Sequence, residues 1–225
     1  MQYPNFQPSK QDIEKLKETY PPHVVMTMIL RAEERDTFLL QHQKTVSLFM
    51  PTNPRKEDPS TTIDNHTYTS NKLSYRTYRA YKDLTKGFFI EKQESKVRGA
   101  SILRDELLQL KWEFMDTTRE ILGFTCKLAR TRHYLNDENV VHAWYTEEIP
   151  VSNGPRLYGG LPGIILEIKE NSHTLRAIKI RFPETMKIPK PPEIDGEVLN
   201  FESYLKFLDK SAAKQRRLMR AINGG

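Results

Sequence analysis

Residues 149–168 constrain the fold of this chain more than any other stretch, because a dense group of turn-forming residues runs directly into an apolar strand. Four glycines and three prolines lie between Ile149 and Gly163, although the whole sequence has only 10 glycines and 14 prolines. Glycine adopts backbone conformations that other residues avoid and proline fixes φ, so the loop is predicted to follow one specified path. Its motif residues are Gly154, Pro155, Gly160, Leu161, Pro162 and Gly163.

The residues after this loop alternate as expected for a strand. The pattern places Ile164, Leu166 and Ile168 on one predicted face and Ile165, Glu167 and Lys169 on the other. A second strand at 174–182 follows a turn at Glu170–His173 and repeats apolar residues at Ile178, Ile180 and Phe182. The two strands are therefore predicted to form a hairpin that belongs to the core.

Three segments carry a resemblance to a known family. Gly160-Leu-Pro-Gly-Ile-Ile-Leu-Glu-Ile168 resembles the signature of the GLPGLI family of Bacteroidota envelope proteins, with Ile164-Ile165 in place of Leu-Ile, and Gly123–Ala129 and Ala143–Pro155 resemble two further segments of it. The family has no agreed biochemical activity. The resemblance implies an exported, β-rich, non-enzymatic protein. The chain is also similar to the bowl-like N-terminal domain of some secreted peptide N-glycosidases, and this similarity implies an accessory role.

The predicted fold class is mainly β, an antiparallel, strongly curved sheet or half-barrel that the resemblance makes bowl-like. Further apolar runs predict strands at 24–31, 38–50, 75–81, 87–92, 110–121, 124–133 and 140–147, with a hairpin turn at 136–139. Residues 97–108 are compatible with a loop or a short helical turn. Short turns between successive strands favour antiparallel pairing over βαβ units.

Four parts are predicted along the chain. Residues 1–22 form a helical segment, 23–182 the β domain with a long polar loop at 51–72, 183–199 a proline-rich linker, and 200–225 a basic amphipathic helix capped by Asn200. That helix leaves peripheral membrane contact as an open alternative, although basic residues near a helix C-terminus also complement the helix dipole.

Composition narrows the class of protein. The 225 residues suffice for a core, and no run approaches the roughly 18 apolar residues that a membrane helix needs. The N-terminus lacks the regions of a signal peptide. Together with the resemblance, this predicts a mature form in the periplasm or associated with the outer membrane. The 35 basic residues interleave with 29 acidic ones, so we expect a solvated basic surface and no nucleic-acid partner.

No catalytic constellation, metal site or cofactor is predicted. The single cysteine, Cys126, is expected to be inert on the core face of a strand. His133 and His142 would face each other across the predicted hairpin and, with Glu147 or Glu148, could hold a metal ion, but ordinary surface histidines are favoured. Asp116-Thr-Thr118 resembles a short acceptor pattern for O-glycosylation at Thr117 in Bacteroidota.

Aromatic residues around the loop are candidates for a binding site. Trp144, Tyr145, Tyr158 and Trp112 would line a cleft on a concave sheet, with Arg156 as the polar contact for a carboxylate or phosphate. The alternative is that they only pack the core and the loop.

The leading functional hypothesis is an accessory protein that binds an outer-membrane or periplasmic partner, such as a TonB-dependent transporter. That partner is implied by the resemblance alone. The alternative is a periplasmic carrier of an apolar or peptide ligand, and an enzyme ranks third. Gly163 is expected to have a positive φ or to lie against another backbone segment, so that Gly163→Val would be severely destabilising.

Overall fold

The computed structural model describes residues 37–52, 60–63, 66–69, 78–95, 99–170 and 173–210, with the backbone alone for 60–63, 66–69, 94, 95 and 99. The chain divides into two compact units. One comprises Met1–Leu39, Met50–Tyr78 and Gln93–Ala100, and the other Leu40–Phe49, Arg79–Lys92 and Ser101–Gly225. The described part is mainly β, with two main sheets and one helix at 201–210.

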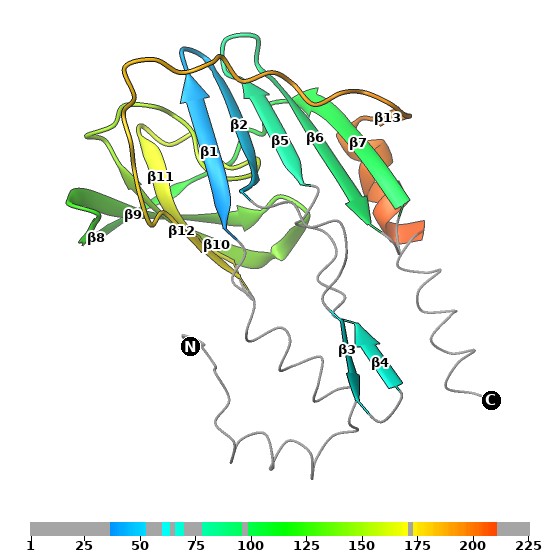
Figure 1. The fold of residues 1–225 in the computed structure, drawn as a ribbon. Helices are drawn as coiled ribbons and strands as arrows, with labels where there is room; N and C mark the ends of the chain where they lie inside the picture. The colour runs from blue at the N-terminus through cyan, green and yellow to red at the C-terminus, as the bar shows by residue number, and fades with distance from the viewer. Residues whose placement is uncertain are drawn as a thin grey trace. The chain divides into compact units, whose positions relative to one another are not determined.

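A six-stranded sheet has the order β1-β2-β5-β6-β7-β13 (Figure 1). Its strands are β1 (Phe38–Gln43), β2 (Val46–Pro51), β5 (Arg79–Asp83), β6 (Phe88–Ser95), β7 (Gly99–Glu106) and β13 (Val198–Leu199). β2, β5 and β6 pair antiparallel, whereas β13 runs parallel to β7. The strands predicted within 38–50 are confirmed. Most of 97–108, where a loop or helical turn was expected, is strand.

A five-stranded sheet has the order β12-β11-β10-β9-β8, and each of its neighbouring pairs is antiparallel. Its strands are β8 (Glu113–Ile121), β9 (Phe124–His133), β10 (Asn136–Thr146), β11 (Ile164–Lys169) and β12 (Thr174–Arg176). The predicted antiparallel pairing is therefore confirmed for this sheet. The strands nevertheless form two sheets, neither of them closed, where one curved sheet or half-barrel was expected.

The predicted polar loop at 51–72 contains regular structure. β3 (Ser60–Ile63) and β4 (His66–Thr69) form a separate two-stranded antiparallel hairpin, with Ser60 opposite Thr69. Threonine-rich segments suit strands because β-branched side chains fit a pleated backbone. The prediction of a loop is wrong for these eight residues, which form strands.

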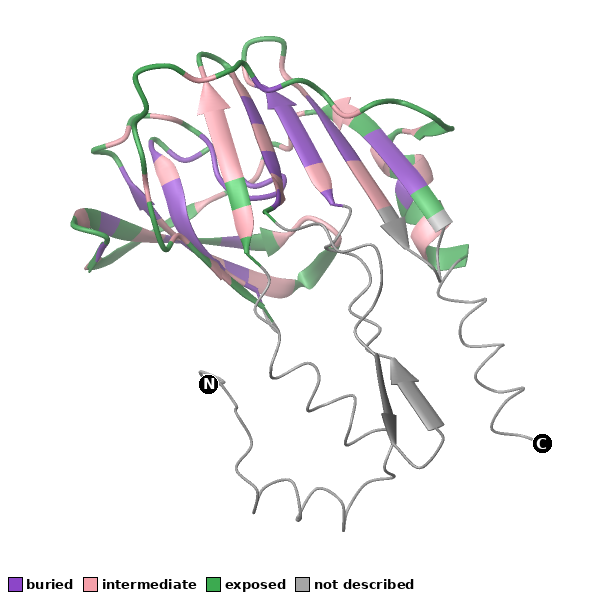
Figure 2. Ribbon diagram, in the orientation of Figure 1, coloured by how far each residue is buried: buried purple, intermediate pink, exposed green. Residues whose placement is uncertain are grey.

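Alternation predicts the buried faces of the central strands well. In β2, Ser47 and Phe49 are buried and Val46 and Leu48 lie on the opposite, partly buried face. Leu48 then pairs with Tyr81 and Tyr81 with Ile90, so that side of the sheet carries a continuous apolar cluster. Figure 2 shows buried residues along β5 of this sheet.

The β9–β10 hairpin turns earlier than predicted. The turn is at Tyr134–Leu135, and β10 already begins at Asn136. The register shifts between Asn136 and Val140, so His142 lies opposite Arg130 and not opposite His133. Arg130, which lies opposite His142, points to the same face as His142. His133 is three residues from Arg130 on β9, so His133 points to the other face. The expected histidine pair is therefore not formed.

A bulge in β11 overturns part of the predicted alternation. The register shifts so that Ile165 pairs with Tyr145, Glu167 with Trp144 and Ile168 with Ala143, which leaves Leu166 without a partner. A bulge places two residues opposite one and reverses the faces beyond it. Ile168 therefore joins Ile165 in one cluster, while Leu166 packs in another with Ile164. Glu167 follows Leu166 to the side of Trp144.

The predicted core strand at 174–182 is wrong beyond its first residues. β12 spans only Thr174–Arg176, and Ile178 and Phe182 are 76% and 72% exposed. Only Ala177 and Ile180 pack, partly buried, on the cluster around Cys126. The segment alternates like a strand, but β12 is at the edge of its sheet and pairs with β11 over three residues.

The strand predicted at 110–121 starts later than expected. β8 begins at Glu113, a bulge lies between Met115 and Thr118, and Phe114 is 64% exposed. Thr117 lies within this bulge and is exposed.

Helix 201–210 follows a segment, 183–197, without regular structure. Asn200 caps it as predicted, since the Ser203 N–H donates to Asn200 Oδ1 at 2.9 Å. Residues 1–36 and 211–225 lie outside the described residues, as do the predicted N-terminal helix, the strand at 24–31 and most of the basic C-terminal helix. Within the described ranges, no helix is both long and apolar enough to cross a membrane.

Candidate functional site

The loop at 149–163 is ordered by its own backbone. Asn153 N–H donates to Val151 O at 2.7 Å, and Asn153 and Gly159 form an antiparallel bridge. The first residues of β11 donate back into the loop, Ile164 to Ile149 O at 3.1 Å and Ile165 to Asn153 O at 2.9 Å. The predicted specified path is confirmed.

Gly163 lies directly against the end of β10. A Cβ at this position would be 1.9 Å from Thr146 O and 2.6 Å from Thr146 C. No side chain fits at such distances from a backbone. Of the two predicted reasons for glycine here, close approach is confirmed, whereas the positive φ belongs to Gly160, at 84°.

Lys82 of β5 connects the six-stranded sheet to the loop. Its ammonium group donates to Gly154 O and to Tyr158 O, each at 2.8 Å. The side chain is fully buried, and this burial lowers the pKa of Lys82 to about 7. The loop carbonyls thus gain a strong donor, but keeping that donor charged away from water is costly.

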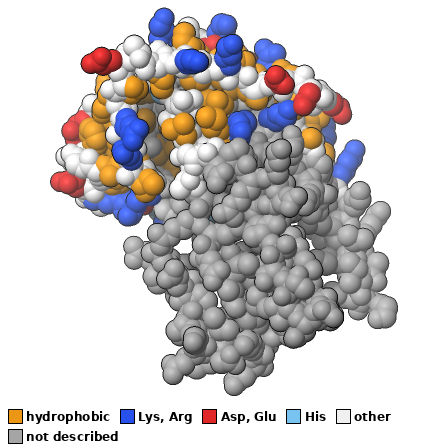
Figure 3. Space-filling view, viewed as in Figure 1, with side chains coloured by type: hydrophobic (Ala, Val, Ile, Leu, Met, Phe, Trp, Pro, Cys, Tyr) orange, Lys and Arg blue, Asp and Glu red, His pale blue; other side chains and the backbone are white. Residues whose placement is uncertain are grey.

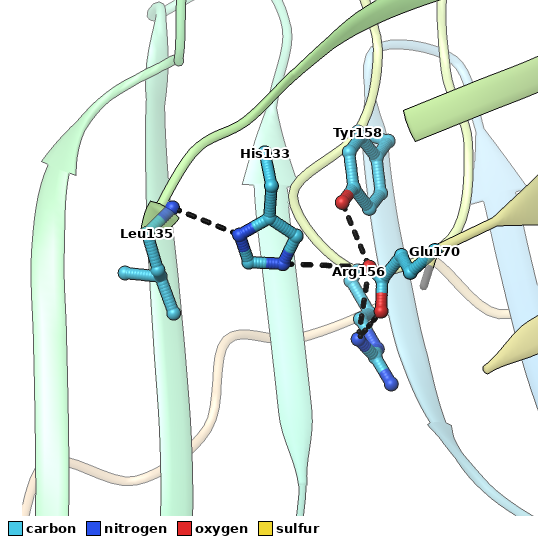
Figure 4. Close-up of polar contacts among 5 residues, drawn as sticks. All are labelled: His133, Leu135, Arg156, Tyr158 and Glu170. Atoms are coloured by element: carbon cyan, nitrogen blue, oxygen red, sulfur yellow. Dashed lines mark hydrogen bonds and ion pairs between the residues drawn. The ribbon is translucent and has the colours of Figure 1, made fainter. Parts of the chain in front are cut away.

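Glu170, directly after β11, is the centre of a buried polar network (Figure 4). Arg156 Nη1 lies 3.0 and 3.1 Å from its two carboxylate oxygens, and Tyr158 OH donates to Oε1 at 2.7 Å. The exposed fractions are 6% for Arg156, 0% for Tyr158 and 9% for Glu170. Arg156 reaches this position with a positive φ of 52°. Burial, followed by the Glu170 charge, raises the pKa of Tyr158, so its hydroxyl remains a donor.

Two aromatic residues from the β9–β10 turn complete the Glu170 network, which we define as His133, Tyr134, Arg156, Tyr158 and Glu170. His133 Nε2 lies 3.7 Å from Glu170 Oε1, and its Nδ1 accepts from Leu135 N–H at 3.1 Å. Tyr134 stacks on His133 and meets Tyr158 edge to face, with centroids 4.8 and 5.4 Å apart. Burial lowers the pKa of His133, which favours the neutral ring at neutral pH.

The five predicted binding residues do not share one surface. Arg156 and Tyr158 are buried in the Glu170 network, and Tyr145 is buried in the same core cluster as Tyr158. Trp112, partly buried, donates from Nε1 to Gly159 O at 2.9 Å and so helps to fix the loop. Trp144 lies on the other face of β10 from Tyr145, partly buried.

Trp144 has its own charged partners. The guanidinium of Arg119 lies 4.1 Å from the centroid of its ring, in cation–π geometry. Glu167, buried beside it, forms ion pairs with Arg119, at 2.6 Å, and with Arg176. The bulge in β11 creates this arrangement because it turns Glu167 toward Trp144.

The other chemically reactive candidates are separated. Cys126 is free and fully buried, and this burial raises the pKa of its thiol, in agreement with the predicted inert role. His142 is on the opposite sheet face from His133. Within the described ranges, no group of three or more His, Cys, Asp or Glu side chains could hold a metal ion.

Three residues of the site were missed by the sequence analysis: Lys82, Tyr134 and Glu170. Lys82 stands in the strand Arg79–Asp83, three of whose five residues are charged, so the sequence does not mark it as buried. Glu170 and Tyr134 carry no signal either, because each follows a strand in what looks like an ordinary polar turn.

Comparisons with known proteins agree with this β architecture. Residues 129–167, which run from β9 through the loop into β11, match a family described as "Protein of unknown function (Porph_ging)". No curated protein matches the chain. Two structures of PNGF-II, in space groups C2 and P21, are similar with TM-scores of 0.51 and 0.52 and 14% identity. The similarity covers 79% of this chain but only 30% of PNGF-II, and at this identity it concerns the fold alone.

Proposed function

We propose that this chain is a non-enzymatic accessory or binding protein of the bacterial cell envelope, exported to the periplasm or associated with the outer membrane. Three observations support the proposal: the resemblance of residues 160–168 to the GLPGLI signature, the match of 129–167 to a family of unknown function, and the fold shared with a part of PNGF-II. In this proposal the chain is a GLPGLI-type module, and the sheets present a bowl-like surface to a partner.

The observation that carries the proposal is the inward direction of the polar groups in the loop. Arg156, Tyr158 and Glu170 bind one another below the surface, and Lys82 binds the loop carbonyls. A catalytic acid, base or nucleophile must reach a substrate atom within about 3 Å. Buried groups that already use their hydrogen bonds on each other act as a scaffold instead. The loop thus serves as a rigid platform for whatever the surface binds.

The partner in this proposal is an outer-membrane protein such as a TonB-dependent transporter. Its test is an affinity purification of the tagged protein from detergent-solubilised native envelopes, with co-purifying proteins identified by mass spectrometry. We expect one outer-membrane transporter in a stoichiometric amount. Purification of the protein alone from the soluble periplasm would contradict the accessory role.

A carrier of an apolar ligand is the second candidate, and the surroundings of Trp144 favour it. Trp144 is partly buried at the margin of an apolar cluster that includes Phe124, Ile164 and Ile180, also partly buried. Apolar surface next to a tryptophan suits a ligand of low polarity. A carrier would change its tryptophan fluorescence when lipid or peptide extracts are added. The Trp144→Ala variant would lose that change, whereas Trp112→Phe, which alters the loop side, would retain it.

A further inference from the structure

Basic side chains line up across the middle of the five-stranded sheet. The register places His142 of β10 between Arg130 of β9 and Lys169 of β11. Arg132, two residues from Arg130 on the same strand, points to the same face and is exposed. We call Arg130, Arg132, His142 and Lys169 the basic row. Figure 3 shows lysine and arginine side chains scattered among hydrophobic ones on the face in view.

The basic row is unfavourable for the isolated protein. Arg130 and Lys169 each lie directly opposite His142, so a positive charge on His142 would be repelled from both neighbouring strands. Burial, followed by the charges of Lys169 and Arg130, lowers the pKa of His142. Among the residues that the structure describes, Glu113 relieves one member, since its carboxylate lies 2.7 Å from Arg130 Nη2. A bound anion would relieve the others.

An aromatic surface adjoins the basic row. Trp144 is two residues from His142 on β10 and lies on the same face. The Arg119 guanidinium lies 4.1 Å from its ring centroid and is itself held by an ion pair with Glu167. Arg176, about half exposed, extends the positive charge past Trp144. The face therefore presents a fixed ring between two groups of cations.

We propose that this face binds an acidic polysaccharide. Strands are spaced about 4.8 Å apart, so the row from Arg130 to Lys169 extends about 10 Å across the sheet. Carboxylates or sulfates repeated along a sugar chain match cations at such intervals, and a sugar ring packs on the part of the half-buried Trp144 ring that faces solvent. The backbone of the three central strands, β9 to β11, is paired on both sides. An extended peptide would find no strand edge there to pair with, which favours a polysaccharide over an acidic polypeptide.

The chain offers a matched control for this proposal. Lys127 is on β9 like Arg130, but it pairs with Tyr145 and bonds to Glu147 on the opposite face. Lys169→Gln and Lys127→Gln therefore remove the same charge from the same sheet, and only the first lies in the basic row. Both side chains lie outside the buried core, so we expect both variants to fold.

The test is titration of the full chain with polygalacturonate by calorimetry at two salt concentrations. We expect Lys169→Gln and Arg130→Gln each to weaken binding about fivefold and to reduce its salt dependence, and Lys127→Gln to change it less than about twofold. Neutral dextran of equal length should not bind. Absence of polygalacturonate binding, or equal losses in Lys127→Gln and Lys169→Gln, would overturn the proposal. Tighter binding of poly-L-glutamate than of polygalacturonate would overturn it in favour of an acidic polypeptide.

Discussion

The loop at 149–163 and the segment at 177–197 both lack regular structure and both contain several prolines, yet they differ in how the chain fixes them. Residues 153–158 of the loop are buried, whereas the segment exposes Ile178, Phe182, Ile188 and Ile194. In Figure 2 the coil that leads from β12 to β13, as labelled in Figure 1, is mostly green and so exposed.

The difference lies in the polar partners. The loop receives a buried ammonium group from Lys82 and a buried carboxylate from Glu170. The segment is held by an ion pair from Lys92 to the exposed Asp195 and by the partial burial of Ala177 and Ile180. Turn-forming residues therefore permit an irregular path, and buried polar partners fix it. Four predictions test this comparison.

The largest effect is expected from adding a side chain to Gly163. Because its Cβ would lie 1.9 Å from Thr146 O, Gly163→Val should lower the free energy of unfolding by more than about 4 kcal/mol or prevent folding. Gly196 in the exposed segment is the control, since the nearest atom to its Cβ would be Ile102 Cδ1 at 3.9 Å. Urea unfolding of Gly163→Ala and Gly196→Ala separates the two regions. Similar midpoints would show that the loop is no more constrained than the segment.

The second-largest effect is expected from removing the charge of the buried Glu170 carboxylate. Glu170→Gln preserves the shape but leaves Arg156 as a buried charge without its counter-ion, which should cost about 3 kcal/mol. Glu184→Gln, on an exposed residue of the segment, should change stability by less than about 0.5 kcal/mol. The double variant Arg156→Met/Glu170→Gln should lose less than the sum of its single variants. An additive double variant would mean that the pair does not act as a unit.

The pH dependence of stability should distinguish Lys82, which binds the loop, from Lys92, which binds the segment at 177–197. Folding lowers the pKa of Lys82 to about 7, so between pH 7 and the unfolded pKa near 10.4 the unfolded chain binds more protons. The free energy of unfolding should therefore rise with pH from 7.5 to 9.5, by up to about 1.4 kcal/mol per pH unit. Denaturant titrations at several pH values measure this slope. Lys82→Met should flatten it and Lys92→Met should not; a slope that survives in Lys82→Met belongs to another group.

The smallest effect is expected at Ile178, which the sequence predicted to lie in the core and which is exposed in the structure. Ile178 is 76% exposed, so Ile178→Ala should change the free energy of unfolding by less than about 0.5 kcal/mol. Ile168→Ala, which truncates a fully buried side chain of the same type, should cost about 2–5 kcal/mol. A large loss from Ile178→Ala, measured in the same urea series, would mean that the segment is packed after all.

The sequence predicts strands where one face is buried and the pairing is regular. Alternation identified β2 and β9 because Phe49 and Cys126 are buried while their neighbours are not. It failed at β11, where the bulge at Leu166 reverses the faces, since a bulge depends on the partner strand. It also failed at 178–182, because alternation cannot show that an edge strand has no further partner.

The candidate site could be located but not interpreted from the sequence. Glycine and proline density identified the loop, and Gly163 was correctly singled out for close approach. The direction of Arg156 and Tyr158 depends on Glu170, which becomes their partner only when β11 is in place. The separation of Trp144 from Tyr145 was implicit in their adjacency, because neighbouring strand residues point to opposite faces.

The parallel pairing of β13 with β7 has a consequence for synthesis of the chain. Val198 lies opposite Ile102, and Phe201 N–H donates to the Asp105 carboxylate across 96 residues of sequence. At roughly 5–20 residues per second, the ribosome needs about 5 to 20 s to make the intervening chain. During that time the edge of β7 has formed without its last strand. The nascent chain therefore exposes an open strand edge until Val198 and Leu199 are translated, and a chaperone that covers such edges would be most useful in that interval.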